Sequence, residues 1–222
     1  MTATLGERSA DHEILTDLAP ALRRAVGLDS QCVVRFRFRG GRATALIRLP
    51  FEVLVSRSVA GDAGVETRDI TVRAAEALAW LDVDGAEAPL TQDALWRSGL
   101  PPEYGWVRLE TVPDDVIRAL VRSGAATLKQ AAAREGDPGA RPRAEVSDAL
   151  LDSVVLTATT DADGAAPISA AVTLRAMSAL TRMGFLPQGG HAFVDSAGRW
   201  ARVVAEYGTV YLERPGSGLT VR

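Results

Sequence analysis

The sequence predicts an α+β fold built from two similar modules, and this prediction depends on two internal repeats and one β-hairpin. Residues 103–110 (EYGWVRLE) return at 206–213 (EYGTVYLE) with six identical positions out of eight. Residues 71–78 (TVRAAEAL) return at 173–180 (TLRAMSAL) with five identities. Because both pairs recur at almost the same offset, we expect an internal duplication.

Each module is expected to be an antiparallel sheet backed by helices, with the two modules related by a pseudo-two-fold axis. We place the boundary at Pro113, which gives modules 1–113 and 114–222. The reason is that a helical segment precedes the repeated segments in both halves.

The helices are predicted from apolar spacing and from their ends. An i, i+4 stripe of apolar residues over 14–26 indicates an amphipathic helix. Either Pro20 kinks this helix, or the helix begins just before Pro20, which then lies in its first turn. The clearest helix follows Pro113, where Asp114 and Asp115 favour the positive end of the helix dipole, and runs to Gly136. Thr71 and Thr173 are candidate N-caps of a helix in each module.

The hairpin at residues 32–49 is the strongest local signal. Gly40-Gly41 lies between two alternating runs, and a two-residue turn needs positive φ at both central positions. Pairing across the turn puts Phe36 and Phe38 on an apolar face and sets Arg39 against Arg42. The opposite face, called the arginine face below, collects Arg35, Arg37, Arg39, Arg42 and Arg48.

The second half is expected to contain a helix at 144–151, a strand at 154–159 and three closing strands at 191–194, 200–205 and 209–213. It has no equivalent of the Gly-Gly arginine hairpin. The two halves have therefore diverged where an acquired function could reside.

Composition limits the function classes. A chain of 222 residues with net charge −3 and pI near 5.5 lacks the broad basic field of proteins that coat nucleic acid. No apolar run reaches a membrane span and the N-terminus lacks the order of a signal peptide, so we expect a cytoplasmic protein. Cys32 is the only cysteine, which excludes an intramolecular disulfide and a thiolate zinc site. We predict no cofactor and no metal.

The arginine face predicts an anion-binding surface, and an acidic protein is the partner that it favours. In sheets that bind nucleic acid, aromatic and basic residues share one face. Here Phe36 and Phe38 alternate away from the arginines, which argues against RNA. The plainer interpretation is a solvated face neutralised by carboxylates such as Glu52 or the acids of residues 82–87.

The repeats permit two interpretations. Arg73 and Arg175, together with Tyr104 and Tyr207, could form two equivalent ligand sites. Alternatively, the shared residues are the packed helix and strand that each half needs to fold, which their apolar and small side chains favour.

Our first hypothesis is therefore a non-enzymatic interaction or regulatory protein. One alternative is an enzyme or small-molecule binder with its site between the modules. Another is a DNA-binding regulator, because residues 127–151 resemble a helix-turn-helix with an overlong turn. A homo-oligomer is left open. No catalytic signature is present, and His12 and His191 have no metal-ligand spacing.

The chain has 24 arginines and a single lysine, Lys129. With its paired modules, this composition resembles uncharacterised two-domain proteins of high-GC Gram-positive bacteria. The resemblance lies in composition and layout and implies no activity.

Overall fold

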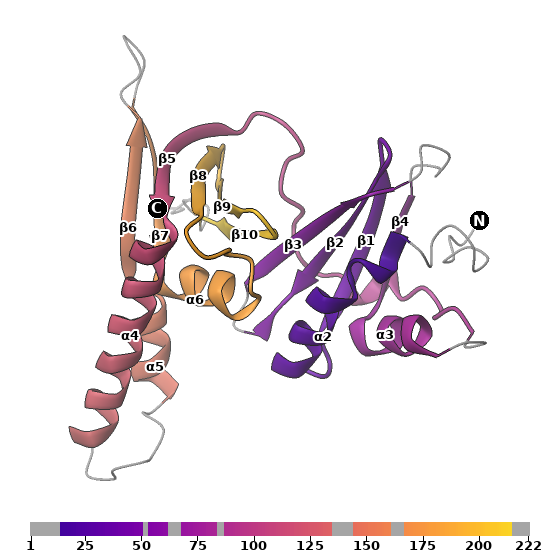
Figure 1. Cartoon of the computed structure of the whole chain (residues 1–222), viewed down its shortest axis with the longest axis horizontal. Coiled ribbons are helices and arrows are strands. Elements are labelled where there is room, and N and C mark those ends of the chain that lie inside the picture. Colours follow the sequence, from indigo (N-terminus) through magenta and orange to yellow (C-terminus); the bar gives the residue numbers. More distant parts are fainter. Residues whose placement is uncertain are drawn as a thin grey trace, which may run out of the picture. The chain divides into compact units, whose positions relative to one another are not determined.

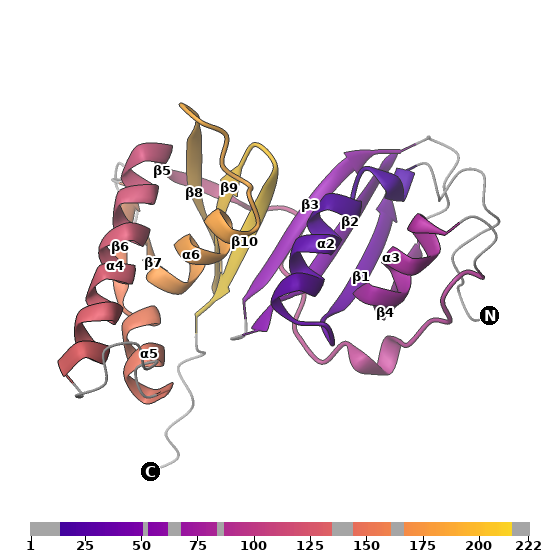
Figure 2. The ribbon, with the colours of Figure 1, turned by 60° about the horizontal axis from the view of Figure 1, so that its bottom comes forward.

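The chain folds into two compact units, 1–100 and 101–222. The computed structural model describes residues 14–50, 53–61, 68–83, 87–134, 144–160 and 167–214 (Figures 1 and 2). The unit boundary lies at Leu100 and not at Pro113. The physical reason is that β5 (Val107–Pro113) pairs with β8 (His191–Ala197), so this strand belongs to the second unit.

The first unit is a four-stranded antiparallel sheet with two helices on one face, as Figure 2 shows. Its strand order is β4-β1-β2-β3, and helices α2 and α3 pack against each other. The elements are α2 (Ala19–Leu28), β1 (Val33–Arg39), β2 (Arg42–Arg48), β3 (Leu54–Ala60), β4 (Arg68–Arg73) and α3 (Ala74–Asp82). The buried core includes Leu22, Phe36, Ile47, Ile70 and Trp80.

The hairpin has the predicted register. Phe38 pairs with Ala43, Phe36 with Ala45, and Arg39 with Arg42. Gly40 and Gly41 have φ values of 57° and 70°, which is the left-handed conformation that glycine adopts without a steric cost. The turn residues therefore fix which side chains of β1 and β2 share a face.

The N-terminal helix follows one of the two predicted forms. The first turn of α2 contains Pro20, and the cap residue is Leu18. The helix ends one residue beyond Gly27. Proline fits in this place because the amides of a first helical turn have no partner within the helix.

The second unit contains a four-stranded antiparallel sheet, a two-stranded antiparallel sheet and three helices among its described residues. The strand orders are β10-β9-β8-β5 and β6-β7. The further elements are α4 (Asp114–Arg134), α5 (Ala144–Leu151), β6 (Val154–Thr160), β7 (Ile168–Thr173), α6 (Leu174–Arg182), β9 (Trp200–Ala205) and β10 (Gly208–Glu213). Ile117, Met177, Val194 and Val210 are fully buried in its core.

The two units repeat one motif, so the fold is α+β with two related modules, each an antiparallel sheet backed by helices. β1, β4 and α3 correspond to β6, β7 and α6. In both, the helix directly follows its strand, and its first amide bonds to the carbonyl just before the partner strand. These bonds are Ala74 N to Cys32 O and Leu174 N to Ser153 O, both 3.0 Å.

The repeated helix sequences are out of structural register by two residues. Strand pairing aligns Arg73 with Thr173, since each ends a strand and precedes a helix. Thr173 is an N-cap as predicted, and its hydroxyl accepts a hydrogen bond from Ala176 N. Thr71 is not a cap, because it is buried within β4. Arg73 and Arg175 are therefore not equivalent residues.

The two tyrosine-glycine segments also differ from the prediction. Tyr104-Gly105 precedes β5 and Tyr207-Gly208 leads into β10, so both lie in the second unit. Their similarity reflects two strands that follow a bend, not one strand in each module.

The helix-turn-helix interpretation of residues 127–151 stays a prediction. Residues 127–134 are the last turns of the single helix α4, which begins at Asp114, and are not a separate helix. α4 has 21 residues, and α5 (Ala144–Leu151) follows it. Residues 135–143 lie outside the described residues.

Candidate functional site

The candidate site is the arginine face of the sheet in the first unit. In the observed register, every second residue of the four strands lies on this face, and Phe36 and Phe38 lie on the other. Among the described strand residues, its charged members are Arg35, Arg37 and Arg39 of β1, Arg42 and Arg48 of β2, and Asp69 and Arg73 of β4. Six arginines of these strands thus share a sheet face with one carboxylate.

Asp69 of the edge strand β4 is the carboxylate of this face. It pairs with Arg37 across the strands, and its Oδ2 lies 3.5 Å from Arg37 Nε. Arg35 Nη2 lies 3.1 Å from Oδ2, and Arg39 Nη2 lies 3.5 Å from Oδ1. Arg35 also donates a hydrogen bond to the Thr71 hydroxyl. Asp69 thus shares one negative charge among three positive charges.

The remaining arginines extend the positive charge to both ends of the face. At one end, exposed Arg42 directly opposes Arg39, a like-charge pair that is unfavourable unless an anion lies nearby. At the other end, Arg48 donates to the Ser98 hydroxyl, and Arg73 Nη1 donates to Gln31 Oε1 at 2.9 Å. Ser98 and Gln31 are neutral, so these two hydrogen bonds orient the guanidinium groups without cancelling their charge.

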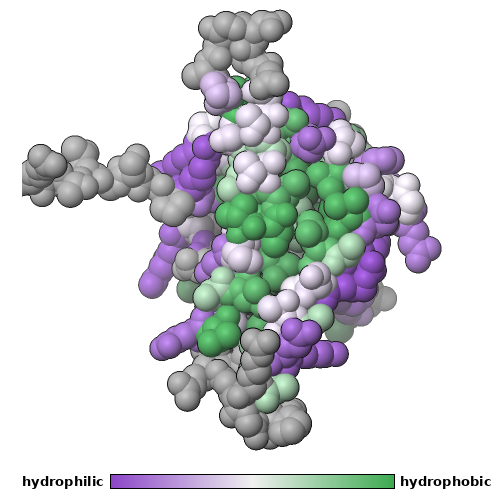
Figure 3. Space-filling view, turned by 90° about the vertical axis from the view of Figure 1, so that its left-hand side faces the viewer, coloured by the Kyte–Doolittle hydropathy of each residue, from purple (hydrophilic) through white to green (hydrophobic). Residues whose placement is uncertain are grey.

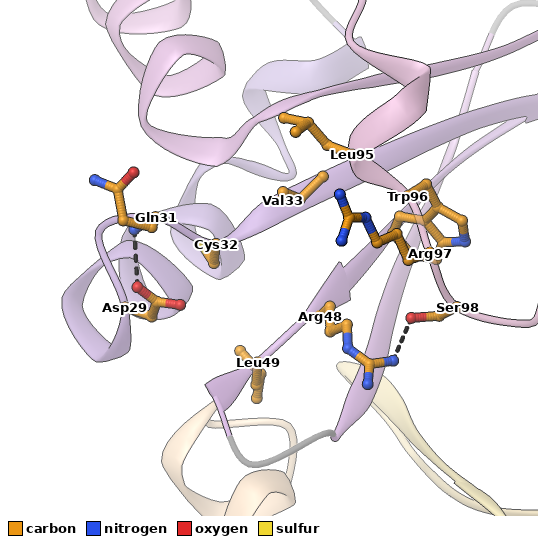
Figure 4. A pocket seen from close by; sticks show the side chains of 10 residues that line it. All are labelled: Asp29, Gln31, Cys32, Val33, Arg48, Leu49, Leu95, Trp96, Arg97 and Ser98. Carbon is orange, nitrogen blue, oxygen red and sulfur yellow. Dashed lines mark hydrogen bonds between the residues drawn. The ribbon is translucent and has the colours of Figure 1, made fainter.

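A pocket of about 290 Å³ lies at the Arg48 end of the face (Figure 4). Arg48 and Arg97 supply its positive charge, and Asp29 is its carboxylate. Apolar atoms come from Val33, Leu49, Leu95 and Trp96. The segment that carries these last two residues is held against β4, because Gln92 N donates to Thr71 O and Thr71 N donates to the Asp93 carboxylate. The pocket can therefore accept an apolar group beside an anionic one.

Cys32 also lines this pocket, but its side chain is buried. Burial, and secondarily the negative charge of Asp29, raise the pKa of the Cys32 thiol to about 11. The thiol is therefore protonated at neutral pH and is a poor nucleophile or metal ligand there.

The other predicted site residues do not join the arginine face. Arg175 lies in the first turn of α6 and forms ion pairs with Asp148 and Asp152, at 3.2 and 2.7 Å. These carboxylates raise the pKa of Arg175, with the hydrogen bond to Asp152 as the largest cause. Arg175 thus fastens α6 to α5. Tyr104 and Tyr207 belong to the second unit and are 82% and 41% exposed.

The neutralising residues differ from those expected at the sequence level. Glu52 lies outside the described residues, and Asp82 pairs with Arg23 of α2. Sequence reasoning misses Asp69, because it assigns no strand to residues 68–73. The alternation of Asp69, Thr71 and Arg73 with Ile70 and Val72 is the signal that could have found it.

A second charged cluster, in the second unit, is also absent from the sequence predictions. Buried Asp195 of β8 binds Arg108 of β5 and Arg202 of β9, at 3.2 and 2.9 Å. Arg202 stacks on the Trp106 ring at 4.2 Å, and Arg108 stacks on Phe193 at 3.7 Å. The cluster therefore links β8 to its two neighbours, β5 and β9. Its arginines lie over aromatic rings of the same unit.

Other ligand chemistry has little support in the described part of the chain. There, no three or more His, Cys, Asp or Glu side chains gather as metal ligands would. None of the helices in that part combines the length and hydropathy that a membrane span needs.

Residues 101–217 match a family described as a domain of unknown function, DUF8185. The chain belongs to this family. Residues 4–98 match a second domain of unknown function, DUF8010. The two matched segments meet near the boundary between the compact units. No curated protein is significantly similar in sequence.

Solved bacterial sliding clamps have a similar fold. The DNA polymerase III subunit beta from Pseudomonas aeruginosa aligns with a TM-score of 0.57 and 14% identity, over 91% of this chain and 62% of that chain. The griselimycin-bound sliding clamp from Bartonella birtlesii gives 0.55 and 10%, over 90% and 63%. The carprofen complex of the Helicobacter pylori beta clamp gives 0.52 and 10%, over 89% and 61%. The chain therefore spans about three-fifths of their length, and the likeness shows the fold alone.

Proposed function

We propose that this chain is a non-enzymatic, cytoplasmic protein-interaction module that holds an acidic segment of a partner protein on the arginine face. The observation that carries the proposal is the charge imbalance of that face, where the described strands place six arginines and one carboxylate. The fold likeness agrees with it, because a similar fold serves as a subunit of DNA polymerase III in Pseudomonas aeruginosa.

Arginine suits this role for geometric reasons. A guanidinium group presents donors in a planar fork that matches both oxygens of a carboxylate, and it stays charged at any physiological pH. Strand pairing fixes the backbone positions of the arginines of β1 and β2, and Asp69 lies within ion-pair distance of three of them before a partner arrives. Little conformational entropy is then lost on binding, which favours affinity.

The face suits an acidic protein better than single-stranded nucleic acid. Nucleic-acid-binding sheets offer aromatic rings on which bases stack. Phe36 and Phe38 are buried on the opposite face of this sheet. The pocket at the Arg48 end offers instead an apolar lining that fits a protein side chain next to an acidic residue.

The test is binding of a fluorescent Glu-rich peptide to the full chain, measured by anisotropy at low and high salt. Arg39 and Arg42 are the most exposed members of the face, so their replacement by Ala disturbs the fold least. We expect Arg39→Ala with Arg42→Ala to weaken binding about tenfold, which is about 1.4 kcal/mol. Binding by the natural chain should also fall as salt screens the charges.

The matched control is Arg122→Ala with Lys129→Ala, which removes two exposed positive charges from α4. This control should bind the peptide as the natural chain does. Equal peptide affinity in both double variants, or tighter binding of an oligothymidine than of the peptide, would contradict the proposal.

A further inference from the structure

In the two-stranded sheet of the second unit, β6 has one paired neighbour among the described residues, whereas the corresponding strand of the first unit has two. β1 is flanked on one side by β4 and on the other by β2. β6, which corresponds to β1, pairs only with β7 among the described residues. The place that β2 occupies beside β1 therefore has no strand from the described part of the second unit. The N–H and C=O groups on that edge of β6 can pair with another strand.

Within the described residues this edge has no charged side chain or proline against such pairing, and the only irregularity of β6 is the register shift between Val154 and Leu156 near its start. Edge strands of soluble proteins commonly carry charged residues, prolines or a covering loop. Charged residues make up 24% of the chain, yet β6 (VVLTATT) and β7 (ISAAVT) contain none, and neither contains proline. By contrast, β4 at the edge of the other module has Arg68, Asp69 and Arg73, and residues 92 and 93 bond along it.

Exposed apolar side chains lie on the elements around this edge. Val154 of β6 is 55% exposed, and Val107 of β5, Val116 of α4 and Ile168 of β7 are also exposed. β5 packs beside β6 and is itself the last strand of its sheet. Figure 3 looks onto this side and shows hydrophobic surface at its centre with hydrophilic surface around it. Such a patch beside an open edge is typical of a protein interface.

We propose that β6 is a homodimer interface, in which β6 of a second copy pairs antiparallel with it, in the place that β2 occupies beside β1. A two-fold axis near the middle residue, Thr157, makes the strand its own partner, as an isologous interface requires. Strands β7-β6 of one copy and β6-β7 of the other then form one four-stranded sheet.

The neutrality of the strand favours a second copy of β6 over a charged partner strand. Two copies of an uncharged strand meet without like-charge repulsion, and a β6 edge without charges offers no salt bridge to an acidic or basic partner. Threonine and valine dominate β6, and both fit a central strand. The exposed apolar residues of β5, α4 and β7 would be buried in the same contact, which adds a hydrophobic contribution.

The experiment measures the mass of the full chain by sedimentation velocity between about 1 and 100 μM, the range of weak to moderate dimers. We expect a concentration-dependent dimer. Thr157→Glu with Thr159→Glu places two charges at exposed positions of β6, so the monomer should fold normally. In the dimer the carboxylates introduced at position 157 meet across the axis, and we expect the dimer affinity to fall at least about tenfold.

The matched control is Ser169→Glu, an exposed position of β7 that pairs with Thr159 but lies one strand away from the edge. It should dimerise like the natural chain, and far-UV circular dichroism should show all variants folded. A natural chain that is monomeric at every concentration overturns the proposal. So does a dimer that persists in the Thr157→Glu, Thr159→Glu variant, because that dimer uses another surface.

Discussion

Two glycines in the same sequence context are required for different physical reasons. Gly105 and Gly208 stand in the same Tyr-Gly pair, but they act differently. Gly105 has φ of +78°, a left-handed conformation that other residues adopt at a cost. A Cβ on Gly208 would lie 2.6 Å from the ring of Phe185, which is buried. Gly105 is needed for its backbone conformation, and Gly208 is needed because a side chain there would clash with Phe185.

Cys32 permits a direct test at this scale. Because burial raises the pKa of its thiol to about 11, little thiolate exists at pH 8. We expect Ellman's reagent to label the native chain far more slowly than the same chain in guanidinium chloride, where the thiol titrates normally. Since Cys32 is the only cysteine, the absorbance reports this residue alone. Equal labelling rates in the two conditions would show that the thiol is accessible.

Elements with a strict local pattern are the ones that sequence predicts well. The β1-β2 hairpin has the predicted turn and register, because two glycines and alternating side chains determine both. α4 and α5 also form where their apolar spacing indicates. β4 and β7 escape prediction, because each is short and runs directly into a helix. Their pairing with β1 and β6 defines both strands, and the alternation over residues 69–73 is too short to separate β4 from the helix that follows it.

The hairpin turn gives a prediction for an element. Gly40 has φ of +57°, and a Cβ added there would meet no atom within 4 Å, so only backbone strain should matter. We expect Gly40→Val to lower the free energy of unfolding by roughly 1–2 kcal/mol, the cost of the left-handed conformation. Gly40→Asn should cost less, because asparagine tolerates this conformation. Urea unfolding of both variants measures the difference, and equal losses would contradict a backbone origin.

For the whole molecule, long-range polar contacts hold elements in place. Asp114 at the start of α4 accepts hydrogen bonds from Arg118 Nε and Gly189 N, at 3.1 and 3.2 Å. Arg118 in turn donates to Leu186 O at 3.0 Å. The hydrogen bond from Arg118 is the largest cause that lowers the pKa of Asp114. This network fastens α4 to the loop before β8.

The pKa of Asp114 makes the stability of the chain depend on pH. Its folded value lies below the unfolded value of about 3.9, so its contribution is present above that pH and is lost as pH falls through the folded value. We expect Asp114→Asn to be less stable than the natural chain at pH 7 and to lose less on acidification to pH 3. Urea unfolding at both pH values measures this.

The control for this prediction is Asp115→Asn. Asp115 is exposed, and its carboxylate accepts a hydrogen bond from Val116 N that asparagine can keep. This variant should show the same pH dependence as the natural chain. If Asp114→Asn also kept the full acid sensitivity, other groups would be responsible for it.

The sequence by itself determined the α+β class, the hairpin and the placement of five arginines on one sheet face, because turn residues and period-two alternation act locally. Only the tertiary structure decided that Asp69 neutralises part of that face, that Arg73 and Arg175 are not equivalent, and that β6 lacks, among the described residues, the neighbour that β1 has. Each of these depends on which strands pair, and strand pairing is set by contacts between segments that are distant in the chain.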